Sequence, residues 1–288
     1  MLSLALVLLG ILLLALGAGV LGSLLGLGGG LVIVPGLVLL FGVDVHFAVA
    51  CSLISVIATS AGSASRYASR GLLHLRLGFF LEIATAVGAL FGAFLTAFVL
   101  LGPAGSEVLY VAFAAVCVSA MALLYRDLRR GQDPAPPPDP LADRWRLHGV
   151  APPEGGLGAT PFRVGRVRTG MALAFVAGCA SGLLGIGGGI YKVPAMTSVM
   201  GVPIKVASAT SSLMIGVTAV AGALVYLAQG DVLPLIVAPV AVGTLGGTFL
   251  GTRLHALAST RTLKLAFILV LLAAALIMVL RGLGVSSL

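Results

Sequence analysis

Two stretches of this sequence are nearly the same: residues 24–35 read LLGLGGGLVIVP, and residues 183–194 read LLGIGGGIYKVP. Each interrupts an apolar run with four glycines and closes on a proline. They are aligned by a shift of 159 residues (183 minus 24), and the register holds without a gap for about 70 residues. The shift also matches Gly42 with Gly201, Ser52 with Ser211, Thr59 with Thr218, Tyr67 with Tyr226 and Gly92 with Gly251. Matches of this length in one register indicate an internal duplication.

The composition indicates a membrane protein. Of the 288 residues, 59% are hydrophobic and only 9% are charged, and the mean hydropathy is +1.17. Apolar runs long enough to cross a bilayer recur along the chain. The sequence therefore predicts an all-α polytopic membrane protein built from two repeats of about five segments each. The predicted segments are residues 3–25, 31–42, 45–65, 77–101 and 107–125, then 169–184, 190–200, 204–228, 232–254 and 262–281.

An odd number of segments makes the second repeat enter the membrane from the other side. The charges between segments follow such an inversion under the positive-inside rule. The turn after the third segment is basic in the first repeat and acidic in the second. The turn after the fourth segment is acidic in the first repeat and basic in the second. The bases are Arg66, Arg70 and Arg76 in the first repeat and Arg253, Arg261 and Lys264 in the second. We expect inverted repeats, with the central connector in the cytoplasm and both termini outside.

The repeats, residues 1–125 and 169–288, are joined by a connector rich in Pro, Gly and Arg at residues 126–168. It holds eight Arg and five acidic residues, and its composition predicts a flexible loop without a packed core. The formal net charge of the chain, +8, is concentrated in loops. This distribution is typical of membrane orientation and gives no reason to expect a nucleic-acid partner. The expected surroundings are the lipid bilayer.

The two glycine motifs precede segments that are too short to span a membrane. At about 1.5 Å per residue, segments 31–42 and 190–200 reach roughly 17 Å, whereas the hydrocarbon core is about 30 Å thick. Broken helices at matching positions of two repeats indicate a transporter's binding site, because free N–H groups at a helix start attract anions. The predicted substrate-binding residues are Gly26, Gly28, Gly29, Gly30 and Pro35, with their counterparts Gly185, Gly187, Gly188, Gly189 and Pro194. Alternatively, the glycines only let helices cross closely.

Three polar residues near the motifs complete the predicted binding site. Lys192 lies in the first turn of the second short segment, where its counterpart is Ile33. The sequence leaves open whether its ammonium contacts a bound anion or extends to lipid headgroups. Ser52 and Ser211 are matched hydroxyls that follow the two short segments. Such hydroxyls either line a polar path or donate to helix carbonyls.

Two acidic residues are candidates for coupling transport to a proton or another ion. Glu82 lies inside the fourth segment, and Asp44 precedes the third. An acid within a membrane segment indicates function by default, but for Glu82 we favour pairing with Arg76 near the surface. The sequence holds no metal-site or cofactor motif and no phosphate-binding GxxxxGK[ST] motif. No catalytic residue and no cofactor are therefore predicted.

Several features together resemble the sulfite exporter TauE/SafE family. They are the duplicated GxGGGxxxxP motif, the Gly-Val pair after each short segment, the A-x-S sequence at residues 50–52 and 209–211, and the basic central connector. The resemblance covers both apolar halves and leaves out the connector. It implies a permease of a bacterial-type inner membrane that moves small sulfur-containing anions, such as sulfite, sulfoacetate or related sulfonates.

The predicted function is secondary transport of a small anion by alternating access, in which one repeat moves against the other. A passive anion channel and a transporter of a non-sulfur organic anion are alternatives, because both would use the same site. An enzyme is not expected, since the apolar segments offer almost no clustered His, Asp, Glu or Cys.

Overall fold

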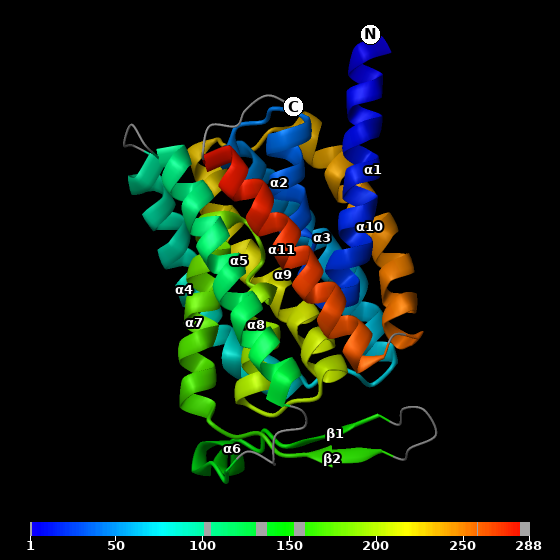
Figure 1. Cartoon of the computed structure of the whole chain (residues 1–288), viewed down its shortest axis with the longest axis vertical. Coiled ribbons are helices and arrows are strands. Elements are labelled where there is room, and N and C mark those ends of the chain that lie inside the picture. Colours follow the sequence, from blue (N-terminus) through cyan, green and yellow to red (C-terminus); the bar gives the residue numbers. More distant parts are fainter. Residues whose placement is uncertain (1, 101–104, 131–136, 153–158, 258, 283–288) are drawn as a thin grey trace.

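The computed structural model describes residues 2–100, 105–130, 137–152, 159–257 and 259–282, which form a bundle of helices (Figure 1). The first half contains α1 (Leu2–Leu25), α2 (Gly30–Leu40), α3 (Val45–Ser69), α4 (Leu75–Leu100) and α5 (Gly105–Arg130). The connector contains α6 (Pro140–Arg144), β1 (Gly149–Ala151) and β2 (Thr160–Phe162). The second half contains α7 (Val167–Leu184), α8 (Gly189–Pro194), the π-helix η1 (Ala195–Val199), α9 (Ile204–Gln229), α10 (Pro234–Leu257) and α11 (Thr260–Gly282).

The predicted fold class, an all-α polytopic membrane protein, is confirmed. Seven helices in the described ranges are long and apolar enough to cross a membrane, namely α1, α3, α4, α7, α9, α10 and α11. Both short segments are also present, α2 with 11 residues and α8 continued by η1. Neither is long enough to cross the bilayer as a straight helix.

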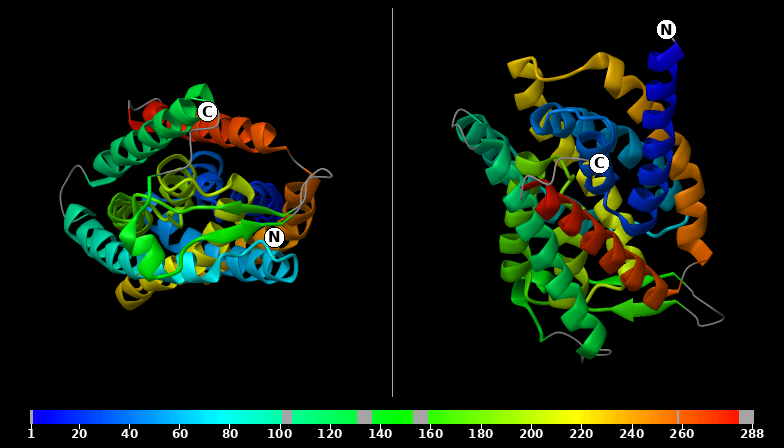
Figure 2. Two further views of the ribbon diagram at one scale, coloured as in Figure 1. Left: turned by 90° about the horizontal axis from the view of Figure 1, so that it is seen from below. Right: turned by 45° about the horizontal axis from the view of Figure 1, so that its top comes forward.

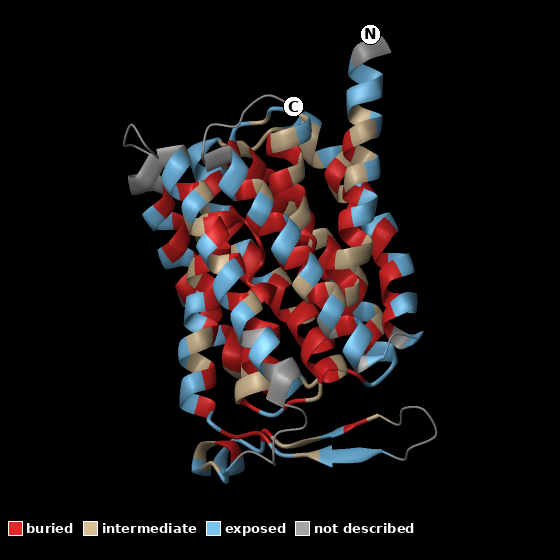
Figure 3. Cartoon of the chain, in the orientation of Figure 1, coloured by how far each residue is buried: buried red, intermediate tan, exposed pale blue. Residues whose placement is uncertain are grey.

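The bundle has an inner layer that carries the short helices and an outer layer around it (Figures 1 and 2). At the centre α3 packs against α9, with α2 and α8 beside them. Around this centre α1 packs along α10, α4 along α7, and α5 along α11. In the most apolar stretch of α3, 61% of the residues are buried, against 22% in α1, and Figure 3 shows this contrast by colour. The outer helices expose many Leu, Val and Phe side chains, as expected for contact with lipid.

The two halves repeat each other in backbone conformation and hydrogen bonding. The glycines with left-handed φ in the described residues form five pairs separated by 159 residues: Gly26/Gly185, Gly28/Gly187, Gly29/Gly188, Gly42/Gly201 and Gly71/Gly230. Tyr67 and its counterpart Tyr226 donate hydrogen bonds across the bundle, to the carbonyls of the matched residues Ser23 and Gly182. In Figure 1, α1 runs downward and its counterpart α7 runs upward. The inversion of the repeats across a membrane stays a prediction.

The connector and the turn after α3 lie at the same end of the bundle. Arg70 at the end of α3 donates to the carbonyl of Thr252 in α10 at 2.6 Å, and His74 donates through Nε2 to the carbonyl of His148 in the connector at 3.1 Å. α1 begins and α11 ends at the opposite end (Figure 1). The outer ends of these two helices thus lie on one side and the connector on the other. Which side is cytoplasmic stays a prediction.

The expectation that residues 126–168 form a loop without a packed core is wrong for the described part of the connector. α5 continues to Arg130, and α6 is followed by an antiparallel hairpin in which Gly149 of β1 faces Phe162 of β2. Ala142, Leu147 and Val164 are buried in one hydrophobic cluster with side chains of α4, η1 and α9. The connector therefore covers one end of the bundle (Figure 1).

Asp139 ties the connector to the start of the second repeat. Its Oδ1 accepts a hydrogen bond from the N–H of Leu141 at 2.9 Å, and its Oδ2 accepts one from the N–H of Val167 at 2.6 Å. One carboxylate thus caps α6 and holds the first residue of α7. The Val167 N–H, helped by the other N–H donors and the nearby charge of Arg168, holds the pKa of Asp139 below its usual range.

We expect Asp139→Ala to loosen the connector, because the substitution removes the acceptor of two N–H groups at a cost of about 1 kcal/mol. Hydrogen exchange in detergent measures the effect as faster exchange at Leu141 and Val167. The matched control is Asp44→Ala, since Asp44 precedes α3 without making a capping hydrogen bond. Unchanged exchange in Asp139→Ala would contradict this role.

The same contact has a defined pH dependence. Because the pKa of Asp139 is lowered in the folded protein, its contribution is complete above the unfolded pKa of about 3.9. It is lost as the pH falls through the lowered folded pKa. We expect protection of the Val167 amide to be constant near neutral pH and to fall only in acid, and to show a smaller fall in Asp139→Ala.

Candidate functional site at the crossing of two glycine loops

Two glycine loops interrupt the inner helices at the centre of the bundle. The first, residues 26–29, joins α1 to α2, and the second, residues 185–188, joins α7 to α8. Three glycines in each loop have φ between +69° and +84°, a left-handed conformation that residues with a Cβ rarely adopt. The remaining positions, Leu27 and Ile186, are buried apolar residues. The first three glycines of each GxGGG motif are thus required by the backbone conformation.

The two loops also contact each other. A side chain on Gly30 would collide with the carbonyl oxygen of Gly185, and one on Gly189 would collide with the carbonyl oxygen of Gly26. The last glycine of each motif therefore makes room for the loop of the other half. This contact matches the close-crossing alternative, and it brings the glycines of both predicted site motifs together in the buried centre.

Ser52 and Ser211 bridge the two halves at this crossing. The Ser52 hydroxyl donates to the carbonyl of Gly185 at 2.8 Å, and the Ser211 hydroxyl donates to the carbonyl of Gly26 at 2.9 Å. Each serine belongs to one half and each carbonyl to the other, so the two bonds are reciprocal. Both hydroxyl protons are used to hold the loops, which gives these serines a structural role. A contact of either serine with substrate stays a prediction.

The two predicted prolines lie in the short helices and are buried, but the backbone that follows each proline differs. α2 continues as an α-helix through Pro35 to Leu40. Pro194 instead ends α8, and the chain widens into the π-helix η1. Proline lacks the N–H that completes the helical ladder, and a π-helix is a rare interruption that occurs mostly as a single turn.

Lys192 is the largest departure from symmetry at the crossing. Its side chain is fully enclosed, with 0% exposed, whereas its counterpart Ile33 is an apolar core residue. The Lys192 ammonium lies 3.3 Å from Oε2 of Glu82 and also donates to the hydroxyl of Thr218. Thr218 in turn donates to Oε1 of Glu82 at 2.6 Å. Three elements, α8, α4 and α9, thus supply one ionic cluster, which we call the Glu82–Lys192–Thr218 cluster.

This cluster corrects two expectations. The favoured pairing of Glu82 with Arg76 is wrong, because Glu82 is buried against Lys192 while Arg76 is exposed at the start of α4. The alternative in which Lys192 extends to lipid headgroups is also wrong, because its side chain is enclosed. Sequence reasoning missed the pair because its partners are 110 residues apart and lie in different halves. The available signal was that each is an isolated charge within an apolar segment, where opposite charges pair.

Asp44, the other acidic residue predicted for ion coupling, lies outside the cluster. The Asp44 side chain is 61% exposed and accepts a hydrogen bond from Nδ1 of His46 at 2.9 Å. The hydroxyls of Ser55, Thr59 and Ser63 donate to carbonyls of their own helix, α3. These hydroxyls are therefore satisfied within their own helix.

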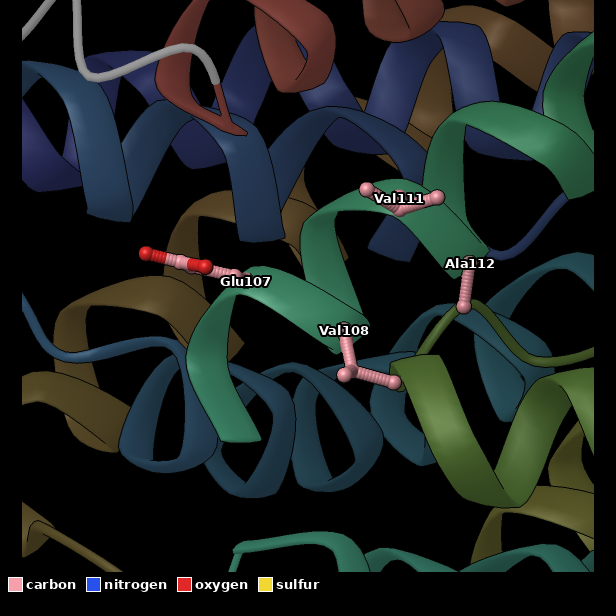
Figure 4. A pocket seen from close by; sticks show the side chains of 4 residues that line it. All are labelled: Glu107, Val108, Val111 and Ala112. Atoms are coloured by element: carbon pink, nitrogen blue, oxygen red, sulfur yellow. The ribbon is translucent and has the colours of Figure 1, made fainter. Parts of the chain in front are cut away.

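A surface pocket of about 400 Å³ lies elsewhere, against α5. It is lined by Glu107, Val108, Val111 and Ala112, and Figure 4 shows these side chains along two turns of that helix. No predicted site residue lines it. Among the residues that the structure describes, no group of three or more His, Cys, Asp or Glu side chains is arranged to hold a metal ion.

We expect Lys192→Met to destabilise the protein by about 3–5 kcal/mol, because it leaves the Glu82 carboxylate buried without a cation. The double variant Lys192→Met/Glu82→Leu should recover most of this loss, since it replaces the pair by apolar side chains. Thermal unfolding in detergent measures both effects. Arg76→Met is the matched control and should melt like wild type. A larger loss in Arg76→Met than in Lys192→Met would refute the assigned pairing.

Known proteins similar to this chain are described as transporters. It is 29% identical to the probable membrane transporter protein YunE of Bacillus subtilis over 88% of this chain and 91% of the relative. It is 26% identical to the probable membrane transporter protein YdhB of the same organism over 87% and 91%. It is 28% identical to the probable membrane transporter protein MamO of Paramagnetospirillum magneticum over 88% of this chain and 42% of that longer protein.

No solved structure matches the chain significantly. The sequence profile of the family described as sulfite exporter TauE/SafE matches residues 11–278, which include both glycine loops and the ionic cluster. The duplicated motif, the helical bundle and this match agree, and the chain belongs to the sulfite exporter TauE/SafE family of membrane proteins.

Proposed function

We propose that this chain is a secondary transporter of a small anion, which binds where the two glycine loops cross and contacts Lys192. The observation that carries the proposal is the buried ammonium beside the second loop. A Cβ on Gly188 would lie 3.4 Å from Cε of Lys192. Among the described residues, Lys192 is the only Lys or Arg that is fully buried. An enclosed ammonium is stabilised by a negative charge beside it, which Glu82 supplies here and which a bound anion would supply in its place.

The proposed substrate is a sulfur oxyanion, either sulfite or an organosulfonate. The family name supports this class, and the chemistry of the site agrees with it. Such an anion offers several acceptor oxygens for the Lys192 ammonium and the Thr218 hydroxyl, the two donors that face Glu82 in this structure. Non-sulfur organic anions would meet the same donors, so the substrate class is decided by experiment.

The proposed transport mechanism is alternating access. Each half carries one short helix, and the two glycine loops hold these helices against each other through Ser52 and Ser211. Movement of one half against the other would reposition both loops and open the crossing to one side at a time. We place the connector in the cytoplasm of a cell with an inner membrane, because the bases gather at that end. Asp44 is given no role in coupling, since it is exposed and bonded to His46.

Reconstitution into liposomes tests the proposal. The purified protein is assayed for uptake of sulfite, sulfoacetate, methanesulfonate, thiosulfate and simple carboxylates. We expect uptake of at least one sulfur oxyanion that saturates with concentration and can be driven against its gradient. Uptake that neither saturates nor runs uphill would favour the passive channel. Saturable uptake of carboxylates alone would favour the non-sulfur alternative, and no uptake of any anion would refute the proposal.

We expect Gly188→Val to reduce transport more than tenfold while membrane insertion is retained. Valine is strained at φ +74°, and its Cβ would lie 2.8 Å from the carbonyl oxygen of Ala177 and 3.4 Å from Cε of Lys192. The matched control is Gly230→Val, which faces the same backbone strain at φ +80° but has nothing within 4 Å. Flux is compared at equal protein density in the liposomes. Equal transport by the two variants would refute the assigned site.

A further inference from the structure

The Lys192 ammonium in this structure is neutralised by a side chain of the protein itself. Counted over the whole residue, Glu82 is 5% exposed and Lys192 is 1% exposed, so both charges lie away from solvent. Burying a lone charge costs far more free energy than burying a neutral pair. A substrate anion that contacts Lys192 would therefore meet the Glu82 carboxylate at the same ammonium. The two anions compete for one cation.

The duplication supplies an internal test of whether this ion pair is needed for the fold. At the matching places in the other half stand Ile33 for Lys192 and Ala241 for Glu82, both without charge. Those positions take part in the same arrangement of short helix and glycine loop. The frame is thus built twice, once with the ion pair and once without it. The charges of the Glu82–Lys192–Thr218 cluster are not required by the architecture, which points to a role in function.

Thr218 gives Glu82 a partner in either protonation state. As a carboxylate, Glu82 accepts a hydrogen bond from the Thr218 hydroxyl at 2.6 Å. A hydroxyl can also accept, so a protonated Glu82 can donate to the same oxygen. Thr218 also lies 3.0 Å from the Met214 carbonyl of its own helix, as its counterpart Thr59 lies 3.0 Å from that of Ser55, but among the described residues only Thr218 of the two bonds an acid. Loss of the charge on Glu82 would therefore not leave a buried polar atom without a partner.

Lys192 is the cation in contact with Glu82, and other titratable groups on the elements packed against α4 lie at different places. Tyr226 of α9 donates to the carbonyl of Gly182, and Arg168 of α7 is exposed. Further groups are Arg76 at the exposed start of α4 itself, Cys179 in α7, Tyr191 in α8 and Lys205 in the first turn of α9. α5, which also packs against α4, carries Glu107, Tyr110, Cys117, Tyr125 and Arg126 among its described side chains.

We propose that Glu82 couples anion transport to protons. Its carboxylate pairs with Lys192 until a proton neutralises the carboxylate, and the substrate anion then takes the place of the carboxylate beside Lys192. The proton comes from water on the side where the anion enters and resides on a carboxyl oxygen of Glu82. One negative charge leaves the cluster by protonation, and one enters with a singly charged substrate. The net charge of the buried cluster stays constant, which avoids the cost of an extra buried charge. This inference rests on the anion site proposed above and adds its coupling ion.

Binding to the wild-type protein gives the first test, which needs no variant to fold. The probe is methanesulfonate, whose sulfonate keeps a single charge across the pH range used. We expect its affinity to rise as the pH falls, by up to about tenfold per pH unit while Glu82 is ionised. In weakly buffered detergent solution, up to about one proton should be taken up per anion bound. Affinity that is independent of pH, without proton uptake, would overturn the coupling role.

Variants then assign the proton to its residue. Glu82→Gln resembles the protonated state, so its affinity for methanesulfonate should be independent of pH and binding should take up no proton. Glu82→Asp keeps a carboxylate and should keep a pH-dependent affinity. The matched control is Glu107→Gln, which removes an exposed carboxylate on α5 and should keep the wild-type pH profile. A wild-type pH profile in Glu82→Gln would overturn the assignment even if binding is proton-coupled.

The outcomes separate this inference from the proposed function. If methanesulfonate and the other anions of the uptake screen fail to bind at every pH, the anion site itself is refuted and the coupling role falls with it. If an anion binds but its affinity ignores pH, the transporter proposal stands and only the role of Glu82 is refuted. If Glu82→Gln does not fold, the wild-type profile and its proton uptake still decide whether binding is proton-coupled.

Discussion

The structure depends on the hydrogen bonds that close two broken helices onto each other. In lipid, a break exposes backbone groups that water cannot reach, and each unsatisfied group costs several kcal/mol. Here each glycine loop offers a carbonyl to a serine of the other half, Gly185 to Ser52 and Gly26 to Ser211. Neither half can complete its own break alone. The duplicated sequence therefore specifies a single bundle rather than two independent domains.

Much of the fold could be predicted because its strongest determinants are local. Glycine at left-handed φ, short apolar runs and the 159-residue register are all visible in the sequence, and they place both short helices. The connector was misjudged for a physical reason. Its core consists of small or scattered residues such as Ala142, Leu147 and Val164, which gain burial only against helices of the membrane bundle. Composition within residues 126–168 carries no sign of that partner surface.

The sequence indicated which two loops form the candidate site, but it did not indicate which charged side chains lie beside them. The glycine motifs indicated the crossing, but no sequence pattern specifies which charges meet there. Pairing Glu82 with Arg76 assumed that neighbours in sequence are neighbours in space, and α4 instead directs Glu82 inward toward α8. Duplication builds a nearly symmetric frame. In this chain the asymmetry is concentrated in Lys192 and Glu82, whose counterparts Ile33 and Ala241 are uncharged.

The connector is attached to the short segment that begins at the second glycine loop. The N–H of Gly165 donates to the carbonyl of Met200 at 3.2 Å, directly after η1, and Met196 and Met200 belong to the hydrophobic cluster under the hairpin. Lys192 lies only two helical turns before that attachment. A displacement of the segment would thus be carried to a water-exposed element. A fluorophore on β2 would therefore report conformational changes around Lys192, whose side chain is enclosed in this structure.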